Sequence, residues 1–325
     1  MQLVLDTPGT IVTHKDGAFR IQGKKGGRTF GPGKLDSIAI TANVQLSAGA
    51  IQLAIRNGIP ILFFDYIGKA QARLWSPYFE SIATLRRQQV HFAESTEATQ
   101  WMIDLFLLKT EAQMAHLKYL KGRKVATGIG ATVAKMKVES RNFENFRGAL
   151  LEEVRQHMMG VEGGIARLYW PAVSSALPRT FRFKKRTRRP AKDYFNAAIN
   201  YAYGMLYSVV EGGLFAAGLD PHLGLLHADE HRKPTLAFDM IEPFRPWADQ
   251  VVSRACVQGQ MQPGFFAKNQ YGFFLNKHGK AFLIPAFNDF LRQRVTYLQQ
   301  EATVKNHIYF LAARLAQRIR ATAGE

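Results

Sequence analysis

The sequence has few of the features that mark secreted or membrane proteins. Its 325 residues include a single cysteine, Cys256, so an internal disulfide is excluded, and with it a small secreted scaffold held by disulfides. The longest apolar runs, such as residues 59–64, fall far short of the roughly 18 residues that a spanning helix needs. The N-terminus lacks the basic start and long apolar stretch of a signal peptide, so we expect a cytoplasmic protein without a membrane partner.

Acidic residues are also scarce relative to basic ones. The chain carries 25 Asp plus Glu against 43 Lys plus Arg, a formal net charge of +18. A surplus of this size favours a polyanionic partner, with nucleic acid as the first candidate. Many basic proteins never bind nucleic acid, so the charge alone leaves that alternative open.

Two kinds of hydrophobic pattern predict an α+β protein with two domains. Residues 1–83 alternate as short strands, with a hairpin turn at Asp16-Gly17 and one helix capped by Ser47. Residues 84–325 follow the 3.6-residue period of helices and show few strand signals. The expected helices of this larger domain cover 101–119, 142–159, 162–173, 194–217 and 289–320.

A basic run between residues 179 and 192 is the main candidate for binding DNA. Arginine grips phosphates with two parallel hydrogen bonds, and the interleaved Phe181 and Phe183 could stack on unpaired bases. The alternative is a solvated loop tethered by these two phenylalanines. The residues expected to contact DNA are Arg182, Lys184, Lys185, Arg186, Arg188 and Arg189.

A polar stripe runs along the long apolar helix predicted for residues 194–217. Asn196, Asn200, Tyr203 and Tyr207 recur at helical spacing and therefore share one face. Asn196, Asn200 and Tyr203 are predicted to line a site. The alternative is a buried helix whose amides satisfy neighbouring backbone groups.

Isolated acids in apolar surroundings are the candidates for catalysis. Asp239 and Glu242 lie three residues apart, so one local turn presents both on the same side. Buried acids are costly unless they are paired or bound to metal, and Arg245 offers a salt bridge as the alternative to metal. Glu162 lies among glycines at the expected start of a helix, where helix electrostatics also favour an acid.

Read literally, the motif His227-x-x-Glu230-His231 matches an inverted zinc-peptidase motif. That chemistry needs both histidines on one helical face. The local sequence is polar and turn-like, so a zinc metallopeptidase is the less favoured alternative.

The ordered set of motifs resembles the CRISPR-associated integrase and endonuclease family, the universal larger subunit of the spacer-acquisition complex. The resemblance extends over nearly the whole chain. It rests on residues 159–169, on Arg189-Pro190 before Asp193, on residues 218–227, and on the stretch Leu236–Pro246.

This resemblance implies a metal-dependent enzyme that inserts foreign DNA fragments into a CRISPR array by transesterification. Glu162, His227 and Asp239 fall on the family's metal-binding catalytic positions, and Glu242 falls on an additional acid near the metal. Carboxylate and imidazole ligands suit Mg²⁺ or Mn²⁺. The expected partners are double-stranded and branched DNA, a second copy of the chain bound through the β-rich domain, and a small ferredoxin-like protein. Removing any of the three ligands is expected to leave the protein folded. A non-catalytic nucleic-acid-binding protein is the alternative.

Overall fold

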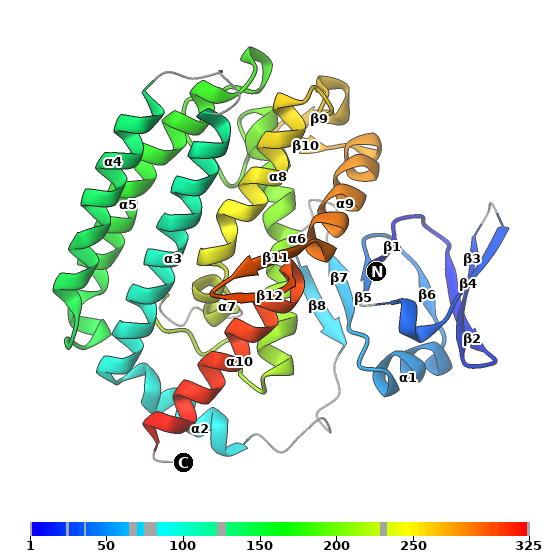
Figure 1. Ribbon diagram of the computed structural model, residues 1–325. Coiled ribbons are helices and arrows are strands. Elements are labelled where there is room, and N and C mark those ends of the chain that lie inside the picture. Colours follow the sequence, from blue (N-terminus) through cyan, green and yellow to red (C-terminus); the bar gives the residue numbers. More distant parts are fainter. Residues whose placement is uncertain are drawn as a thin grey trace. The chain divides into compact units, whose positions relative to one another are not determined.

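The computed structural model describes residues 2–23, 26–35, 37–64, 70–74, 83–121, 128–227 and 233–323. Contacts within the chain divide it into two compact units, Met1–Ser81 and Ile82–Glu325. Helices long and apolar enough to cross a membrane are absent from the described ranges. The α+β prediction is confirmed, since strands dominate the first unit and helices the second (Figure 1).

In its described residues the N-terminal unit contains two four-stranded sheets, the α-helix α1 and the 3-10 turn η1 Pro32–Lys34. In one sheet the order is β1-β5-β7-β8, with β8 antiparallel to β7 and the other neighbours parallel. In the other the order is β4-β3-β2-β6, with β3 antiparallel to both of its neighbours. The elements are β1 Gln2–Leu5, β2 Ile11–Lys15, β3 Ala18–Gly23, β4 Gly26–Phe30, β5 Ser37–Ile40, β6 Gln45–Leu46, α1 Ala48–Arg56, β7 Ile61–Phe64 and β8 Ala70–Leu74.

Local sequence signals account for the turn and the helix of this unit. Asp16 and Gly17 both have positive φ, at 52° and 70°, as the tight turn between β2 and β3 requires. The Ser47 side chain accepts a hydrogen bond from the Ala50 amide and begins α1. Both features agree with the sequence expectation, because each depends on residues that are adjacent in the chain.

The C-terminal unit is mainly helical. Its core is one continuous apolar cluster to which α3, α5, α6, α8 and α10 contribute buried side chains. Figure 1 shows α3, α4 and α5 side by side, and each of the three packs against the other two. The helices are α2 Ala83–Ala93, α3 Thr96–Lys121, α4 Ile129–Ser140, α5 Leu151–Ala176, α6 Tyr194–Ala216, α7 Thr235–Met240, α8 Arg245–Val257, α9 Lys277–Arg292 and α10 Val304–Thr322.

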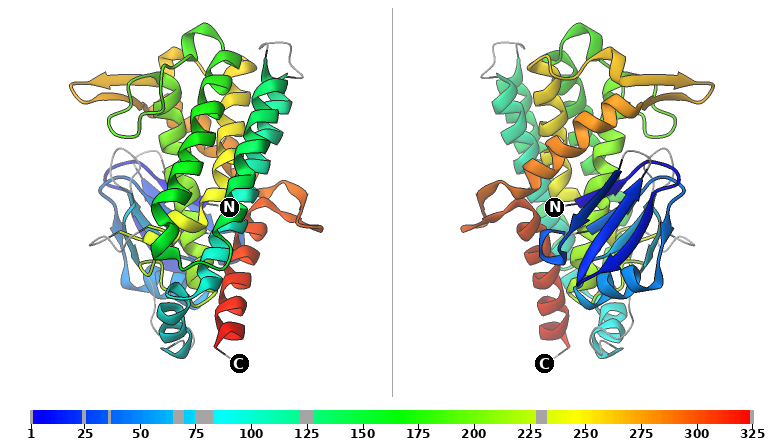
Figure 2. Two further views of the ribbon diagram at one scale, coloured as in Figure 1. Left: turned by 90° about the vertical axis from the view of Figure 1, so that its left-hand side faces the viewer. Right: turned by 90° about the vertical axis from the view of Figure 1, so that its right-hand side faces the viewer.

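Short elements connect these helices. The 3-10 turns are η2 Arg141–Phe146, η3 Arg179–Phe181, η4 Glu242–Phe244 and η5 Pro263–Phe265. Two antiparallel hairpins pair β9 Phe266–Asn269 with β10 Gly272–Leu275, and β11 Arg294–Tyr297 with β12 Gln300–Thr303. Both hairpins project from the helices in the side views of Figure 2.

The single helix expected over residues 289–320 is wrong. The β11–β12 hairpin interrupts it and separates α9 from α10. Its turn is formed by Leu298 and Gln299, with φ of 50° and 63°. Neither leucine nor glutamine is a residue type that favours the left-handed region. The sequence therefore carried no local signal for this hairpin.

The glycine-rich segment around Glu162 also differs from the expectation. It lies inside the continuous helix α5, so Glu162 is in the middle of a helix and not at its start. A β-carbon on Gly164 would lie 2.7 Å from Oε1 of Glu139 on α4. That oxygen is the far end of a flexible side chain, so a larger residue here would require only the Glu139 side chain to move.

Candidate active site

A buried ammonium group lies between two carboxylates that are distant in the sequence. Nζ of Lys109, on α3, is 2.5 Å from Oε1 of Glu162 on α5 and 2.6 Å from Oε2 of Glu242 on η4. Lys109 is 7% exposed and Glu242 6%. Sequence reasoning missed Lys109, although a cation directly after the apolar run Leu105–Leu108 is a signal for a buried charge.

Arg245 neutralises the other carboxylate oxygen of Glu242. Its Nε donates to Oε1 of Glu242 at 2.8 Å, and its Nη2 donates to the Tyr207 hydroxyl at 2.6 Å. Burial disfavours the charged carboxylate, but Coulombic attraction to Arg245 and Lys109 prevails and lowers the pKa of Glu242 to about 2. Glu242 is therefore ionised at neutral pH, and the salt bridge that the sequence left open is present.

Asp239 holds the chain segment that carries His227. Its Oδ2 accepts hydrogen bonds from the amides of Leu225 and Leu226, at 2.7 and 3.1 Å. Its Oδ1 accepts from the His227 amide at 3.2 Å and contacts Nδ1 of the His227 ring at 2.6 Å. The side chain is 0% exposed, so these four contacts account for both carboxylate oxygens.

The His227 ring contacts this carboxylate through Nδ1. Its side chain is 35% exposed. Burial opposes a proton on the ring, but the hydrogen bond and charge of Asp239, with the charge of Glu242, raise the pKa of His227 above its ordinary value. The charge of Glu242 therefore acts on the His227 ring.

The donor set fits a hard divalent cation only in part. Over the described ranges, no three His, Cys, Asp or Glu side chains lie close enough together to enclose a metal ion. Two carboxylate oxygens nevertheless converge on one point, at Nζ of Lys109. Oε2 of Glu242 is buried, and the Lys109 ammonium lies 2.6 Å from it. A buried carboxylate oxygen of this kind is a suitable ligand for Mg²⁺ or Mn²⁺.

A second buried network, also missed by sequence reasoning, is centred on Asp249 of α8. Asp249 accepts hydrogen bonds from the hydroxyls of Tyr203 and Tyr169, both at 2.7 Å. The Tyr169 hydroxyl also contacts Nδ1 of His116 at 2.7 Å. The guanidinium of Arg245 lies 4.9 Å from the centre of the Tyr203 ring, which links this network to the Glu242 site.

The basic run divides into exposed and buried members. Lys184, Lys185, Arg188 and Arg189 are exposed, as phosphate contacts require. Arg182 is exposed too, although its guanidinium donates to the carbonyls of Leu177 and Ser175. Phe181 and Phe183 are buried, so the two rings tether the loop and are not available to stack on bases.

Arg186 differs from its neighbours in this run. Its guanidinium donates to Oδ1 of Asn196 and Oδ1 of Asn200, both at 2.7 Å, and lies over the rings of Trp170 and Tyr203. These contacts hold the guanidinium half-buried against α6, unlike the exposed members of the run. The amides of Asn196 and Asn200 also donate to backbone carbonyls of the loop.

The polar stripe divides in two, because its asparagines hold the basic loop whereas Tyr203 and Tyr207 contact Arg245 beside Glu242. Asn196 and Asn200 bind Arg186 and the loop backbone, which is the alternative that the sequence left open. Tyr203 is 7% exposed and donates to Asp249. Glu230 and His231 of the peptidase motif lie outside the described residues.

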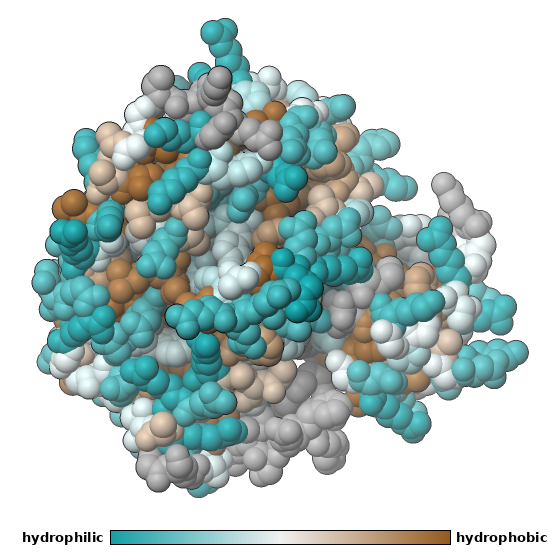
Figure 3. Space-filling model, in the orientation of Figure 1, coloured by the Kyte–Doolittle hydropathy of each residue, from teal (hydrophilic) through white to brown (hydrophobic). Residues whose placement is uncertain are grey.

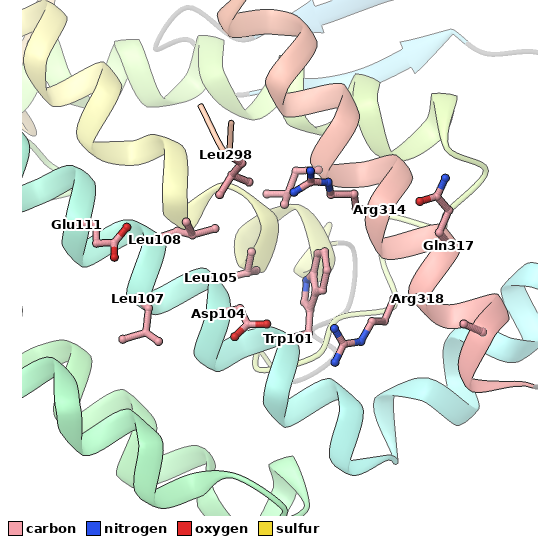
Figure 4. A pocket seen from close by; sticks show the side chains of 12 residues that line it. Trp101, Asp104, Leu105, Leu107, Leu108, Glu111, Leu298, Arg314, Gln317 and Arg318 are labelled. Atoms are coloured by element: carbon pink, nitrogen blue, oxygen red, sulfur yellow. The ribbon is translucent and has the colours of Figure 1, made fainter. Parts of the chain in front are cut away.

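The surface near α10 contains a groove that is separate from these residues. It has a volume of about 640 Å³ and lies between α3, α10 and the tip of the β11–β12 hairpin. Figure 4 shows Asp104 and Glu111 of α3 across from Arg314 and Arg318 of α10, with leucines such as Leu298 between them. Figure 3 shows one face of the molecule, on which apolar patches are separated by hydrophilic side chains. The candidate site residues are not among those that line this groove.

Comparisons with known proteins agree with the resemblance seen in the sequence. The family model described as CRISPR associated protein Cas1 matches residues 3–289. A CRISPR-associated endonuclease Cas1 of Archaeoglobus fulgidus is 28% identical, over 91% of this chain and 90% of its own length. One from Thermus thermophilus is 31% identical, over 80% of this chain and 77% of its own.

Solved structures share the fold. A casposase bound to an integration product superposes with a TM-score of 0.83 at 23% identity, covering 99% of this chain and 91% of that one. A Cas1 protein from Thermotoga maritima superposes with a TM-score of 0.78 at 21% identity, covering 98% and 97%. The chain belongs to the Cas1 family of CRISPR-associated proteins, and the sequence-based prediction of this family is confirmed.

Proposed function

We propose that the protein is a metal-dependent DNA endonuclease and integrase that inserts foreign DNA fragments into a CRISPR array in antiviral defence. Family membership supports the reaction class, because the curated relatives are CRISPR-associated endonucleases. The observation that carries the proposal is the convergence of Glu162 and Glu242 on one buried cation beside His227.

Glu162, Glu242 and His227 are the proposed ligands of Mg²⁺ or Mn²⁺. The contacts of Asp239 support a different role from the ligand role that the resemblance implies. With each oxygen accepting two hydrogen bonds, Asp239 is suited to orient His227 through Nδ1, which leaves Nε2 as the ring nitrogen for a metal. A carboxylate that binds one ring nitrogen fixes both the tautomer and the direction of the other.

The proposed reaction is a transesterification at phosphorus. The 3′-hydroxyl of the incoming fragment attacks a phosphodiester of the repeat, a new P–O bond forms, and the 3′-oxygen of the target strand departs. A bound divalent cation would polarise the phosphate and lower the pKa of the attacking hydroxyl. The chain's own part is to hold Glu162 and Glu242 in place. Arg245 helps to keep Glu242 ionised. Asp239 fixes the direction of the His227 ring.

The exposed basic side chains of the loop are proposed to hold the phosphate backbone of double-stranded and branched DNA. Replacing Lys184, Lys185, Arg188 and Arg189 with Gln should weaken binding to all sequences alike, because phosphate contacts carry no base information. The slope of log affinity against log salt should flatten by about 0.9 for each phosphate that the variant no longer neutralises. Affinity titrations at several salt concentrations measure this, and parallel slopes with equal affinity would exclude the loop from the DNA interface.

The proposed assembly is a homodimer formed through the N-terminal unit, joined by a small ferredoxin-like CRISPR-associated protein. Complexes of a Cas6–RT–Cas1 protein with Cas2 are among the structural neighbours, with TM-scores of 0.78 and 0.64. Light scattering at micromolar concentration, with and without the partner, tests both interfaces. A monomer mass for the isolated protein would contradict the dimer.

Family membership disfavours both alternatives, a non-catalytic nucleic-acid-binding protein and a zinc metallopeptidase using His227, Glu230 and His231. The deciding experiment incubates purified protein with fragments carrying a 3′-hydroxyl and a supercoiled target, in Mg²⁺, Mn²⁺ or chelator. Strand transfer should require the metal and should disappear in Glu162→Gln and Glu242→Gln, whereas the exposed control Asp289→Asn should keep it. Strand transfer in chelator, or in folded Glu162→Gln, would refute the proposed site.

A further inference from the structure

Lys109 is an unusual residue in the centre of the C-terminal unit. Lysine is among the residues that are almost never fully buried unless they are paired. Here the ammonium lies beneath an apolar helix face, 5.8 Å from the centre of the Phe106 ring, and its partners are the two acids proposed to bind metal. The ion pairs with these two acids therefore explain why a charged lysine is buried here. The apolar packing around it does not.

The geometry around Nζ is that of a cation site. Oxygens from two separate elements, α5 and η4, approach the same point to within 2.6 Å. Coulombic attraction to both acids acts on the ammonium, and this attraction does not depend on N–H directions. The same two oxygens would contact any small cation at this point.

The charges of the site balance while Lys109 is in place. Two cationic side chains, Lys109 and Arg245, face two acidic ones, Glu162 and Glu242. A divalent cation entering beside the ammonium would meet acids that are already neutralised, and would be repelled by the ammonium. A metal at these oxygens and the ammonium at its present position thus exclude each other.

We propose that Lys109 is an internal counter-ion that occupies the cation position between Glu162 and Glu242, and that a divalent metal ion binds there by displacing it. This inference rests on the proposed metal site. Lys109 then has two effects. It holds the two acids together in the metal-free protein, and it lowers the affinity of the site for metal.

The test compares Lys109→Met, which keeps the length and removes the charge, with Lys118→Met at an exposed position of the same helix. The Mn²⁺ affinity is measured by calorimetry without DNA, and the melting temperature is measured in chelator and in Mn²⁺. We expect Lys109→Met to bind Mn²⁺ about tenfold more tightly than the parent, as loss of a competing charge implies. It should also melt lower in chelator and regain more stability from Mn²⁺. Lys118→Met should match the parent, and Lys109→Arg, which keeps the charge, should not gain affinity.

Each other outcome also decides the question. Equal or weaker Mn²⁺ affinity in Lys109→Met would overturn the displacement. If Lys109→Met folds only in the presence of Mn²⁺, the metal replaces the ammonium and the proposal is supported. If Mn²⁺ does not restore folding, Lys109 has a structural role that a metal cannot fill, and the proposal is wrong. Glu162→Gln should abolish Mn²⁺ binding in both backgrounds, and binding that survives would instead refute the metal site itself.

Discussion

Replacing Asp239 with Asn should destabilise the C-terminal unit, although the sequence alone predicts that a change at this position leaves the protein folded. Each carboxylate oxygen accepts two hydrogen bonds from the segment Leu225–His227, and the side chain is 0% exposed. The Asn amide nitrogen is a donor. In the Oδ2 position it would face the amides of Leu225 and Leu226, and in the Oδ1 position it would face the His227 amide, while the neutral His227 ring can accept at Nδ1. At least one buried N–H group therefore loses its acceptor, at a cost of about 1–3 kcal/mol.

This loss should be visible in thermal and chemical unfolding. For a unit of this size, a loss of about 2 kcal/mol corresponds to a melting temperature lower by roughly 4–8 °C. His227→Ala is the matched comparison, because it removes only the ring contact to Asp239 and keeps the backbone amides. We expect it to cost about 1 kcal/mol. If Asp239→Asn is as stable as His227→Ala, the backbone hydrogen bonds to the carboxylate do not hold the segment, and the positioning role of Asp239 is refuted.

Three further predictions concern other groups. Burial raises the pKa of Asp249 to about 6 from 3.8 despite two tyrosine hydrogen bonds, so the folded state binds this proton more tightly than the unfolded state. The stability it contributes is complete below about pH 4 and is lost through about pH 6. Urea titrations should therefore show the parent losing about 3 kcal/mol relative to Asp249→Asn between pH 4 and pH 7, and a flat difference would contradict this. Burial also raises the pKa of the Cys256 thiol, so it should resist a disulfide reagent until the protein unfolds, and rapid native labelling would argue against the fold around it. Ser47→Ala removes the cap of α1 and should cost about 1 kcal/mol, measured by hydrogen exchange of the α1 amides, with unchanged protection as the contrary result.

The sequence identified the candidate acids and the histidine, but not the relations among them. Glu162, His227, Asp239 and Glu242 were all found from motif order, and Glu242 with Arg245 was recognised as an alternative pair because the two lie three residues apart. Sequence reasoning gave Asp239 the ligand role and Glu242 a secondary one, whereas the contacts favour the opposite assignment. The assignment depends on which carboxylate oxygens accept hydrogen bonds from the backbone amides of residues 225–227. The spacing of residues in the sequence does not predict these hydrogen bonds.

What the sequence determined by itself depends on neighbours along the chain. The turn at Asp16-Gly17, the cap at Ser47, the helical period of α3 and the surplus of basic charge each follow from residues a few positions apart. The tertiary structure decided the rest. It placed Lys109 between Glu162 and Glu242, which lie 53 and 133 residues further along the chain. It turned Arg186 inward onto Asn196 and Asn200. It also kept α5 helical through its glycines. These outcomes depend on desolvation and on charges brought together by packing, and both arise only when distant segments exclude water between them.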